Sequence, residues 1–337
     1  MNKTIATEGN TLPSKDAALL NGVAALSYLG VIRVVGEDAA KFLQGQLTQD
    51  FVLLGAHEAR LAAFCSAKGR MLASFIGFKR ETVAAVVGTT SAPEILLICN
   101  QDILAATLKR LSMFVMRAKV KLTDATADFA IHGLAGEAFE SASIKIAGKS
   151  INTPAKLDFG PTALVTLYPA LGQPRGLWVA PAGEAAPAGE LLSTELWNWG
   201  EVHSGIAHIS TPIVEAFVPQ MLNYESVGGV NFKKGCYPGQ EVVARSQFRG
   251  TLKRRAYLAQ IDDTTAQPVV GHGVFHSSDA EQPCGTVAQV AKSPEGGFVA
   301  IVSMQVSASV GGKLSLGSAN GVNMALLPLP YVLLEDI

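Results

Sequence analysis

The chain has 337 residues, of which 48% are hydrophobic and 16% are charged, and its formal net charge is −1. This composition excludes a disordered chain, and the length predicts two or three domains. The four cysteines lie far apart and form no C-x-x-C pair, which argues against a zinc site and against a disulfide scaffold. A reducing compartment fits best, so we expect a cytoplasmic protein. The cysteines are Cys65, Cys99, Cys236 and Cys284.

Residues 17–35 are the stretch that most resembles a membrane segment, because they are largely apolar. Polar residues such as Asn21 and Arg33 interrupt them, however, and no run of 18 apolar residues occurs. We interpret the stretch as a short helix followed by a strand. We expect no membrane association and no signal peptide.

The first 125 residues show the pattern of an antiparallel α+β module. Residues 1–15 are polar and are expected to be loose. A helix is predicted to start after an Asp38 N-cap, and a second one over 102–113. The turn at 66–69 separates two apolar runs and predicts a β-hairpin. The predicted strands are 28–35, 60–65, 70–78, 83–87, 94–99 and 114–122.

The middle of the chain continues with three predicted strands, 128–134, 163–167 and 176–180, and with a loop of low complexity at 181–190. A helix is predicted over 190–204. Trp199 follows the apolar stripe of this helix and is expected in the core, whereas Trp197 falls off the stripe. A tryptophan in such a position is either a surface anchor or a platform for an aromatic ligand.

The chain after residue 255 contains short strands separated by glycine and proline turns, and it predicts an all-β barrel or sandwich. His272 and His276 are spaced i, i+4, which would suggest a metal site on a helix. Here they lie in strands and turns, so we assign no metal. The predicted strands are 256–261, 273–275, 285–290, 297–303 and 313–316.

The stretch 227–255 carries seven basic residues and one acidic residue, so its net charge is +6 although the whole chain has −1. Such a concentration of positive charge attracts phosphates, carboxylates or nucleic acid. It contains Cys236, which follows two lysines and precedes a predicted helix that starts at Pro238. A helix N-terminus and neighbouring cations both lower the pKa of a thiol and make it reactive.

Two simpler interpretations of this stretch are a buried cysteine and a solvated basic surface. A lone cysteine is usually a small buried hydrophobe, and a basic run is usually a solvated face. The surrounding glycines and the proline require a special backbone, and for that reason we favour a reactive Cys236 with Lys234 as its electrostatic activator.

The motif KGCYPGQE at 234–241 resembles the signature of the YgfZ family of folate-binding proteins, relatives of the glycine cleavage T-protein, an aminomethyltransferase. Further matches extend the resemblance over nearly the whole chain. They are KFLQGQLT at 41–48, AKGRM at 67–71, VPQ at 218–220, the glycine pair at 228–229 and PLPY at 328–331.

The resemblance implies a multi-domain α+β fold of the aminomethyltransferase type, built from antiparallel α+β modules and a C-terminal all-β barrel. It implies a discontinuous folate-binding domain at 1–55 and 126–205. A ferredoxin-like α+β domain at 56–125 and 206–250 would carry the KGCYPGQE motif. The barrel domain would occupy 251–337.

The resemblance also implies the function and the remaining site residues. The protein would bind tetrahydrofolate or another folate derivative and support iron–sulfur enzymes, including those that thiolate tRNA, with an effect on replication initiation. Trp197 and Tyr28 would form the folate slot, with Leu29 as the alternative to Tyr28. Glu241 and Arg245 would orient groups at the cavity.

Two departures from the relatives bear on activity. The T-protein's aspartate pair after the hairpin glycine is missing, because Gly69 is followed by RMLAS. His203 stands where many relatives have a glutamate that reads the pterin, and Glu201 is a candidate substitute. A folate-dependent one-carbon or aminomethyl transferase, or a demethylase acting on tRNA or protein, is the alternative hypothesis. A plain RNA-binding module using the basic stretch is the third, and direct contact with tRNA is left open.

Overall fold

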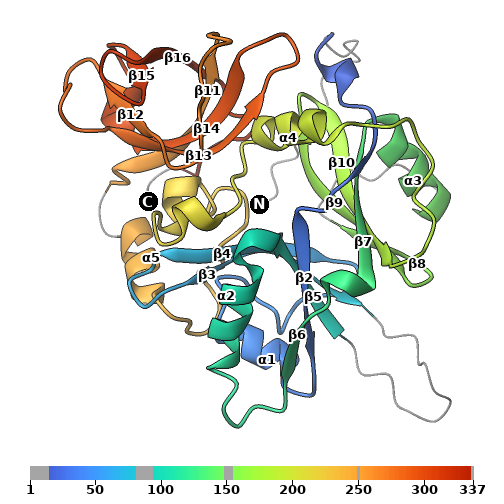
Figure 1. Ribbon diagram of the computed structural model, residues 1–337. Helices are drawn as coiled ribbons and strands as arrows, with labels where there is room; N and C mark the ends of the chain where they lie inside the picture. The colour runs from blue at the N-terminus through green and yellow to red at the C-terminus, as the bar shows by residue number, and fades with distance from the viewer. Residues whose placement is uncertain (1–14, 81–93, 148–154, 249–250, 335–337) are drawn as a thin grey trace, which may run out of the picture.

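The computed structural model describes residues 15–80, 94–147, 155–248 and 251–334. These residues form two five-stranded antiparallel sheets and a closed six-stranded barrel (Figure 1). The predicted fold class, α+β with a terminal all-β barrel, is confirmed. The predicted strand at 83–87 and nearly all of the N-terminal stretch 1–15 lie outside the described residues.

The first sheet has the strand order β1-β7-β10-β9-β8. Side chains alternate between its two faces, so Arg175 and Leu177 of β10 point to the interior, whereas Trp178 packs on the outer face. The sequence analysis missed the four-residue strands β1 and β8, which are too short for a periodic signal, and helix α3. The elements are β1 (Gly22–Ala25), β7 (Phe129–Ala135), α3 (Glu137–Ala147), β8 (Lys156–Phe159), β9 (Thr162–Ala170) and β10 (Gln173–Pro181).

The second sheet has the order β3-β4-β5-β2-β6, and the predicted hairpin is confirmed by the antiparallel pairing of β3 with β4. Strand β2 pairs with β5 and β6, so residues 29–35 share a sheet with 59–124. The domain limits stay a prediction. The elements are β2 (Leu29–Val35), α1 (Ala39–Gln44), β3 (Ala59–Cys65), β4 (Met71–Arg80), β5 (Glu94–Asn100), α2 (Gln101–Ser112) and β6 (Lys121–Asp124).

One prediction for the second sheet needs correction. Of the strand predicted over 114–122, only the end forms, as β6, because the chain turns through Met116 with a left-handed φ of 39°. Asp38 stands at the N-cap of α1, as predicted, but its side chain makes no capping hydrogen bond, since its carboxylate accepts from the backbone N–H of Lys119 at 2.8 Å.

The barrel closes in the order β11-β14-β13-β12-β15-β16. It encloses its own hydrophobic core, separate from the core between the sheets. The five predicted strands all form, and a sixth, β16, completes the closure. The elements are β11 (Arg254–Ile261), β12 (Gly273–His276), β13 (Gly285–Lys292), β14 (Phe298–Gln305), β15 (Leu314–Leu316) and β16 (Val322–Leu327).

Helix α4 (Thr194–His203) contacts both the first sheet and the barrel (Figure 1). It starts four residues after the predicted position, because the Ser193 hydroxyl caps it by accepting a hydrogen bond from the backbone N–H of Leu196. Trp199 is buried as expected. Trp197, which the helical spacing placed off the apolar stripe, is buried too, with 1% of its surface exposed. Its indole lies against Gly133, where a Cβ would come within 2.6 Å of the ring.

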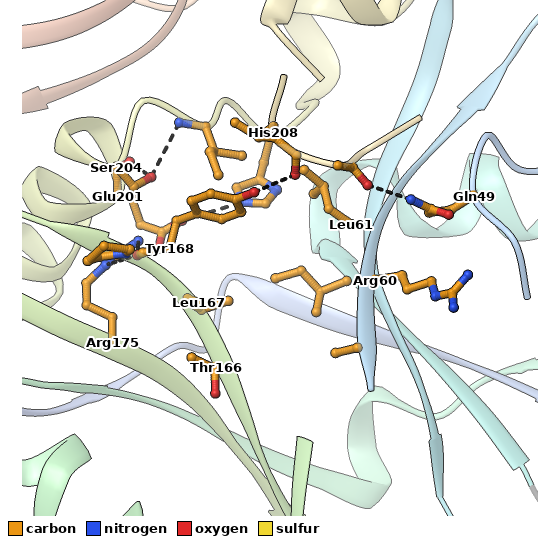
Figure 2. Close-up of a pocket in the computed structure, with 16 residues that line it drawn as sticks. Gln49, Arg60, Leu61, Thr166, Leu167, Tyr168, Arg175, Glu201, Ser204 and His208 are labelled. Carbon is orange, nitrogen blue, oxygen red and sulfur yellow. Dashed lines mark hydrogen bonds and ion pairs between the residues drawn. The ribbon is translucent and has the colours of Figure 1, made fainter. Parts of the chain in front are cut away.

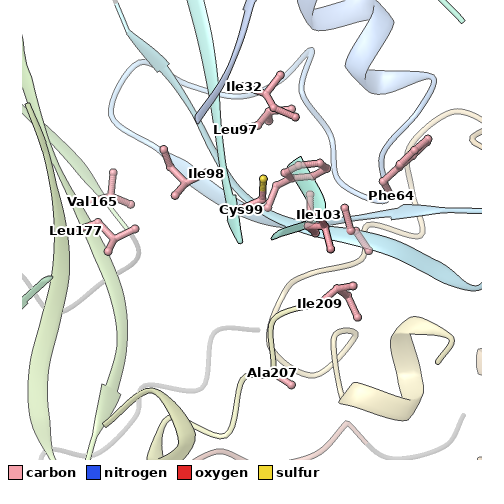
Figure 3. Close-up of a cluster of buried hydrophobic side chains, with 14 of the residues drawn as sticks. Ile32, Phe64, Leu97, Ile98, Cys99, Ile103, Val165, Leu177, Ala207 and Ile209 are labelled. Atoms are coloured by element: carbon pink, nitrogen blue, oxygen red, sulfur yellow. The ribbon is translucent and has the colours of Figure 1, made fainter. Parts of the chain in front are cut away.

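The main core lies between the two sheets, and it gives the cavity described below a rigid frame. Figure 3 shows Val165 and Leu177 projecting from the first sheet toward the second, with Ile98 and Cys99 on the other side. The segment after α4 closes the core from below with Ile209. Within the described residues, no helix is long and apolar enough to cross a membrane.

The remaining elements are short. Helix α5 (Gln240–Phe248) follows the cysteine, and the described part of the chain has five 3-10 helices in its connections. The latter are η1 (Ala17–Leu19), η2 (Thr126–Asp128), η3 (Thr211–Ile213), η4 (Pro219–Leu222) and η5 (Val306–Ser309).

A buried ion pair ties the barrel to the segment that leads to the cysteine. The carboxylate of Glu225 accepts a hydrogen bond from Arg255 of β11 at 2.7 Å, and both side chains are less than a tenth exposed. Arg255 also donates to the carbonyl oxygen of Leu334 near the C-terminus. Burial raises the pKa of Glu225 despite the attraction of Arg255. Desolvation thus outweighs the attraction of Arg255 at this carboxylate, and the pair matters because removal of one partner leaves the charge of the other buried.

We predict that Glu225→Ala lowers the free energy of unfolding by about 3–5 kcal/mol, since it leaves the guanidinium of Arg255 buried beside a cavity. Urea unfolding followed by circular dichroism measures the change. Glu241→Ala is the control, because it breaks an ion pair with Arg245 whose side chains are 88% and 57% exposed, and such pairs contribute little. Equal effects of the two substitutions would contradict the role assigned to the buried pair.

Candidate functional site

The Lys234 side chain anchors the cysteine loop, residues 233–239. Lys234 is only 8% exposed, and its ammonium group donates hydrogen bonds to the carbonyl oxygens of Gln44 and Leu47. Two of the motifs singled out in the sequence, 41–48 and 234–241, therefore meet at this ammonium group.

The surroundings of Lys234 lower the pKa of its ammonium group. Burial lowers the pKa of Lys234 to about 8, while the charges of Asp50 and Cys236 act in the opposite direction. The ammonium also lies 4.8 Å from the centre of the Tyr237 ring, within the range of a cation–π contact. A titratable amine is thus held next to the cysteine and away from bulk water.

Two further motifs hold the other end of the loop. Gly239 has a left-handed φ of 78°, and a Cβ there would lie 2.6 Å from the Cα of Gly69 at the tip of the β3–β4 hairpin. The side-chain amide of Gln220 donates to the carbonyl oxygen of Val243 in α5 at 2.6 Å. The predicted helix start at Pro238 is wrong, because the left-handed Gly239 cannot belong to a helix and α5 begins one residue later.

Cys236 is the exposed thiol of the protein, whereas the other three cysteines are buried. Burial raises the pKa of both Cys65 and Cys99 to about 12, and it also raises the pKa of Cys284. The simpler reading of Cys236 as a small core residue is therefore wrong.

Glu241 and Arg245 lie one turn apart on α5 and pair with each other at 3.0 Å. Both side chains are mostly exposed to solvent, and neither lines the cavities described next. Both residues follow the cysteine loop in the chain. The structure does not place them together with Tyr28 and Trp197, which line a cavity elsewhere.

A cavity of about 430 Å³ lies between the two sheets, the end of α4 and the segment that leads to the cysteine (Figure 2). Its walls are largely apolar, with Leu61, Ile76 and Leu167 on facing strands. Polar groups gather at one end. The lining residues are Gln49, Ala59, Arg60, Leu61, Ile76, Thr166, Leu167, Tyr168, Pro169, Arg175, Glu201, Ser204, Ile206, His208, Val227 and Gly228.

The polar end of the cavity is built around Glu201. One carboxylate oxygen, Oε1, accepts a hydrogen bond from Arg175 at 2.7 Å, and Arg175 also donates to the carbonyl oxygen of Tyr168. The other oxygen, Oε2, lies 3.6 Å from Nε2 of His208, too far for a hydrogen bond. Burial lowers the pKa of His208, which favours its neutral form. Within the described residues, Oε2 thus has no hydrogen-bond donor.

Tyr28, Leu29 and Trp197 line a second, smaller cavity of about 60 Å³ that shares Glu201 with the large one. The indole N–H of Trp197 donates to the hydroxyl of Tyr28 at 3.1 Å, and burial raises the pKa of Tyr28. The guanidinium of Arg175 lies 5.0 Å from the Trp197 ring. The predicted aromatic pair is therefore brought together. It lines the small cavity and not the large one, whereas Glu201 lines both.

His203 does not take the place of the missing glutamate. Its ring packs edge-on against Trp199 at 4.8 Å, and burial lowers its pKa to about 4. Residues 201 and 203 are two apart on a helix and point in different directions. Glu201 therefore occupies the cavity, as the sequence analysis allowed.

The sequence analysis missed Arg175, Tyr168, His208 and Gln49 as cavity residues. Arg175 gave no signal, because it precedes the predicted strand 176–180. Glu201 stands one turn after Trp197, so the two had to share a face of α4. The described residues contain no cluster of three or more His, Cys, Asp or Glu side chains that could hold a metal ion.

The fold is that of an aminomethyltransferase. The chain superimposes on the crystal structure of glycine cleavage system aminomethyltransferase T from Bartonella henselae with a TM-score of 0.64, over 94% of this chain and 89% of that chain, at 16% identity. No protein-family model matches the chain.

Sequence relatives identify the family. The tRNA-modifying protein YgfZ of Cronobacter sakazakii is 29% identical over 337 residues, which cover 96% of this chain and 97% of the relative. The protein of the same name from Colwellia psychrerythraea is 30% identical over 260 residues, 74% of this chain and 75% of the relative. The chain belongs to the YgfZ family.

We predict that a single thiol of the native protein reacts rapidly with a disulfide reagent such as dithionitrobenzoate, and that the other three react only after unfolding. A pKa of about 12, as at Cys65 and Cys99, leaves on the order of 1 in 100,000 of a thiol ionised at pH 7, and burial blocks access to all three. Cys236→Ser should remove the rapid reaction, whereas the control Cys284→Ser should keep it. Rapid reaction of two or more thiols would contradict the burial described here.

Proposed function

We propose that this protein is a folate-binding accessory factor in tRNA modification and that Cys236 is its reactive group. The observation that carries the proposal is the exposed Cys236 thiol, held beside the buried ammonium group of Lys234. The relatives carry the name tRNA-modifying protein, which supports a role in tRNA modification. The cavity between the sheets supports a small-molecule cofactor.

The cavity fits the chemistry of a reduced folate. Its volume of about 430 Å³ falls within the range of small-molecule sites, and its apolar walls suit a flat heterocycle. A pterin presents adjacent N–H donors on one edge, and a carboxylate oxygen without a donor is their natural acceptor. Oε2 of Glu201 is such an oxygen. When bound, the folate would supply or accept a one-carbon unit.

The aromatic pair has a supporting role in this proposal. Trp197 is fully buried, and it holds Arg175 by a cation–π contact and Tyr28 by a hydrogen bond. Arg175 in turn fixes one oxygen of Glu201, which leaves the other oxygen directed at the ligand. Leu29 completes the wall of the small cavity. We propose that Tyr28 and Trp197 shape the pterin end of the site by positioning Glu201.

The outer part of the proposed site lies on the cysteine loop. Lys234 fixes the loop, and it also holds an ammonium group whose pKa of about 8 permits proton exchange near neutral pH. Glu241 and Arg245 lie on the exposed face of α5, where they are available to a large partner. The proposed partners are iron–sulfur enzymes that modify tRNA, such as tRNA-thiolating enzymes, and through them replication initiation would be affected.

The alternative function is a one-carbon or aminomethyl transferase, or a demethylase, acting on tRNA or protein. The aminomethyltransferase fold favours it. The residues after Gly69, which include buried Met71, Leu72 and Ala73, offer no carboxylate to polarise an amine. Turnover of methylene-tetrahydrofolate by the purified protein, with a tRNA or protein acceptor, would favour this alternative. A steep loss of tRNA binding with salt would instead indicate direct contact with RNA.

We predict that Glu201→Gln weakens tetrahydrofolate binding by about 10- to 100-fold, because it removes a hydrogen-bonded charge from the pterin edge. Titration of tetrahydrofolate followed by tryptophan fluorescence gives the affinity, and Trp197→Phe identifies the reporting residue. His203→Glu is the matched control, since its side chain faces Trp199, and its affinity should stay within a factor of about three of the wild type. The assignment fails if His203→Glu alters binding and Glu201→Gln does not.

We predict that Cys236→Ala fails to restore tRNA thiolation in a strain that lacks the protein, because the transferable or redox-active sulfur is gone. The level of thiolated nucleosides in bulk tRNA measures the result. Cys284→Ala, a buried thiol in the barrel, should complement fully. Both variants are first checked for a wild-type thermal unfolding midpoint. Full rescue by Cys236→Ala would remove the thiol from the mechanism.

A further inference from the structure

Two segments that the sequence analysis selected for other reasons run side by side and form a strap, defined here as residues 44–49 and 228–234. The side-chain amide of Gln49 donates to the carbonyl oxygen of Gly228 at 2.6 Å. The backbone N–H of Asn231 donates to the carbonyl oxygen of Thr48 at 2.9 Å. As one segment advances, its partners recede along the other, so the strap is antiparallel, although its residues form no regular strand.

The two ends of the strap have different surroundings. At one end, Gln49 and Gly228 both line the large cavity. At the other end, the ammonium of Lys234 is bonded to the carbonyl oxygens of Gln44 and Leu47. Cys236 follows two residues later. The strap is thus a chain of polar contacts that runs from the cavity wall to Lys234, two residues before the exposed thiol.

Thr48 is the central fastening of the strap. It is fully buried, and its hydroxyl donates to the carbonyl oxygen of Gly229 at 2.7 Å. The same hydroxyl accepts a hydrogen bond from the backbone N–H of Ala63 in β3 at 2.8 Å. One side chain therefore joins both segments of the strap to the rigid second sheet.

We propose that the strap couples the cavity to Cys236, so that a ligand in the cavity holds the cysteine loop in place. The inference rests on the proposed function, because it needs a ligand that binds there. A ligand that packs against Gln49 and Gly228 stabilises closure of this end of the strap by mass action, and the fastening at Thr48 passes the closure on to the Lys234 end. Thr48 and Lys234 are positioning residues in this arrangement: they transmit order and touch neither the ligand nor a reacting atom of it.

The physical reason for such coupling is that no regular ladder of backbone hydrogen bonds holds the strap closed. A sheet ladder resists local opening because many backbone hydrogen bonds break together. The strap depends on the side-chain contacts of Gln49, Thr48 and Lys234 and on one backbone hydrogen bond between its segments, from Asn231 to Thr48. A ligand therefore shifts the equilibrium of the strap toward its closed state. The neighbouring strands β3 and β4 stay paired with or without the ligand.

The test is amide hydrogen exchange of the peptide around 229–235, measured with and without tetrahydrofolate. At a ligand concentration of 100 times Kd, exchange through strap opening should slow by up to about 100-fold. Asn231 is the reporter, because its backbone N–H donates to the carbonyl oxygen of Thr48 across the strap. A peptide from β14 in the barrel serves as the internal reference and should not change.

Thr48→Val removes the central fastening while conserving volume. It should still bind tetrahydrofolate, yet the ligand should slow strap exchange by less than about threefold. Thr126→Val is the matched control, since the Thr126 hydroxyl also accepts a backbone N–H, from Val31, but lies outside the strap. If Thr48→Val does not fold, Lys234→Met opens the strap at its other end and should give the same result.

The outcomes separate the two proposals. If tetrahydrofolate does not bind the wild-type protein in the fluorescence titration, the proposed function fails. If it binds but leaves exchange in 229–235 unchanged, the coupling fails while folate binding stands. If Thr48→Val and Thr126→Val respond equally to the ligand, the strap is not the route and the inference is overturned.

Discussion

The buried ammonium group of Lys234 is the interaction on which the arrangement of the site depends. An ammonium group removed from water needs acceptors for its protons. It finds two of them, the carbonyl oxygens of Gln44 and Leu47. Gln44 is the last residue of α1, and the last carbonyls of a helix have no intrahelical partner, whereas Leu47 lies beyond the helix. The end of α1 and the residues after it therefore hold the cysteine loop, in which Cys236 is exposed.

A second buried charge, that of Arg175, determines the arrangement of the polar end of the cavity. Arg175 and Glu201 form an ion pair inside the protein, where desolvation offsets much of the attraction. Such a pair contributes little net stability, so its value lies in the geometry that it imposes. Arg175 uses its remaining donors on the carbonyl oxygen of Tyr168, and Glu201 is left with one oxygen toward the cavity. The protein thus maintains a polar end in an otherwise apolar pocket.

The sequence predicted the features that depend on local pattern and failed on those that depend on distant contacts. The barrel, the β3–β4 hairpin and the special backbone at Cys236 were recognisable from glycine, proline and alternating apolar residues. Trp197 was misplaced because helical spacing describes one apolar face, and α4 is covered on two sides, by the first sheet and by the barrel. The pairing of Glu201 with Arg175, 26 residues away, left no mark in either local pattern.

The exposed thiol does not line the cavity, and the strap is the element that lies between the two. A reactive sulfur that must meet a large partner has to lie at the surface, whereas a flat cofactor is best held in an apolar slot between rigid sheets. The two requirements cannot be met at one point, so some element must connect them. A regular strand would connect them rigidly, and occupancy of the slot would then change nothing at the sulfur. In the coupling that we propose, the contacts of Gln49, Thr48 and Lys234 form no regular ladder, so that order at the cavity end is passed on to the cysteine loop.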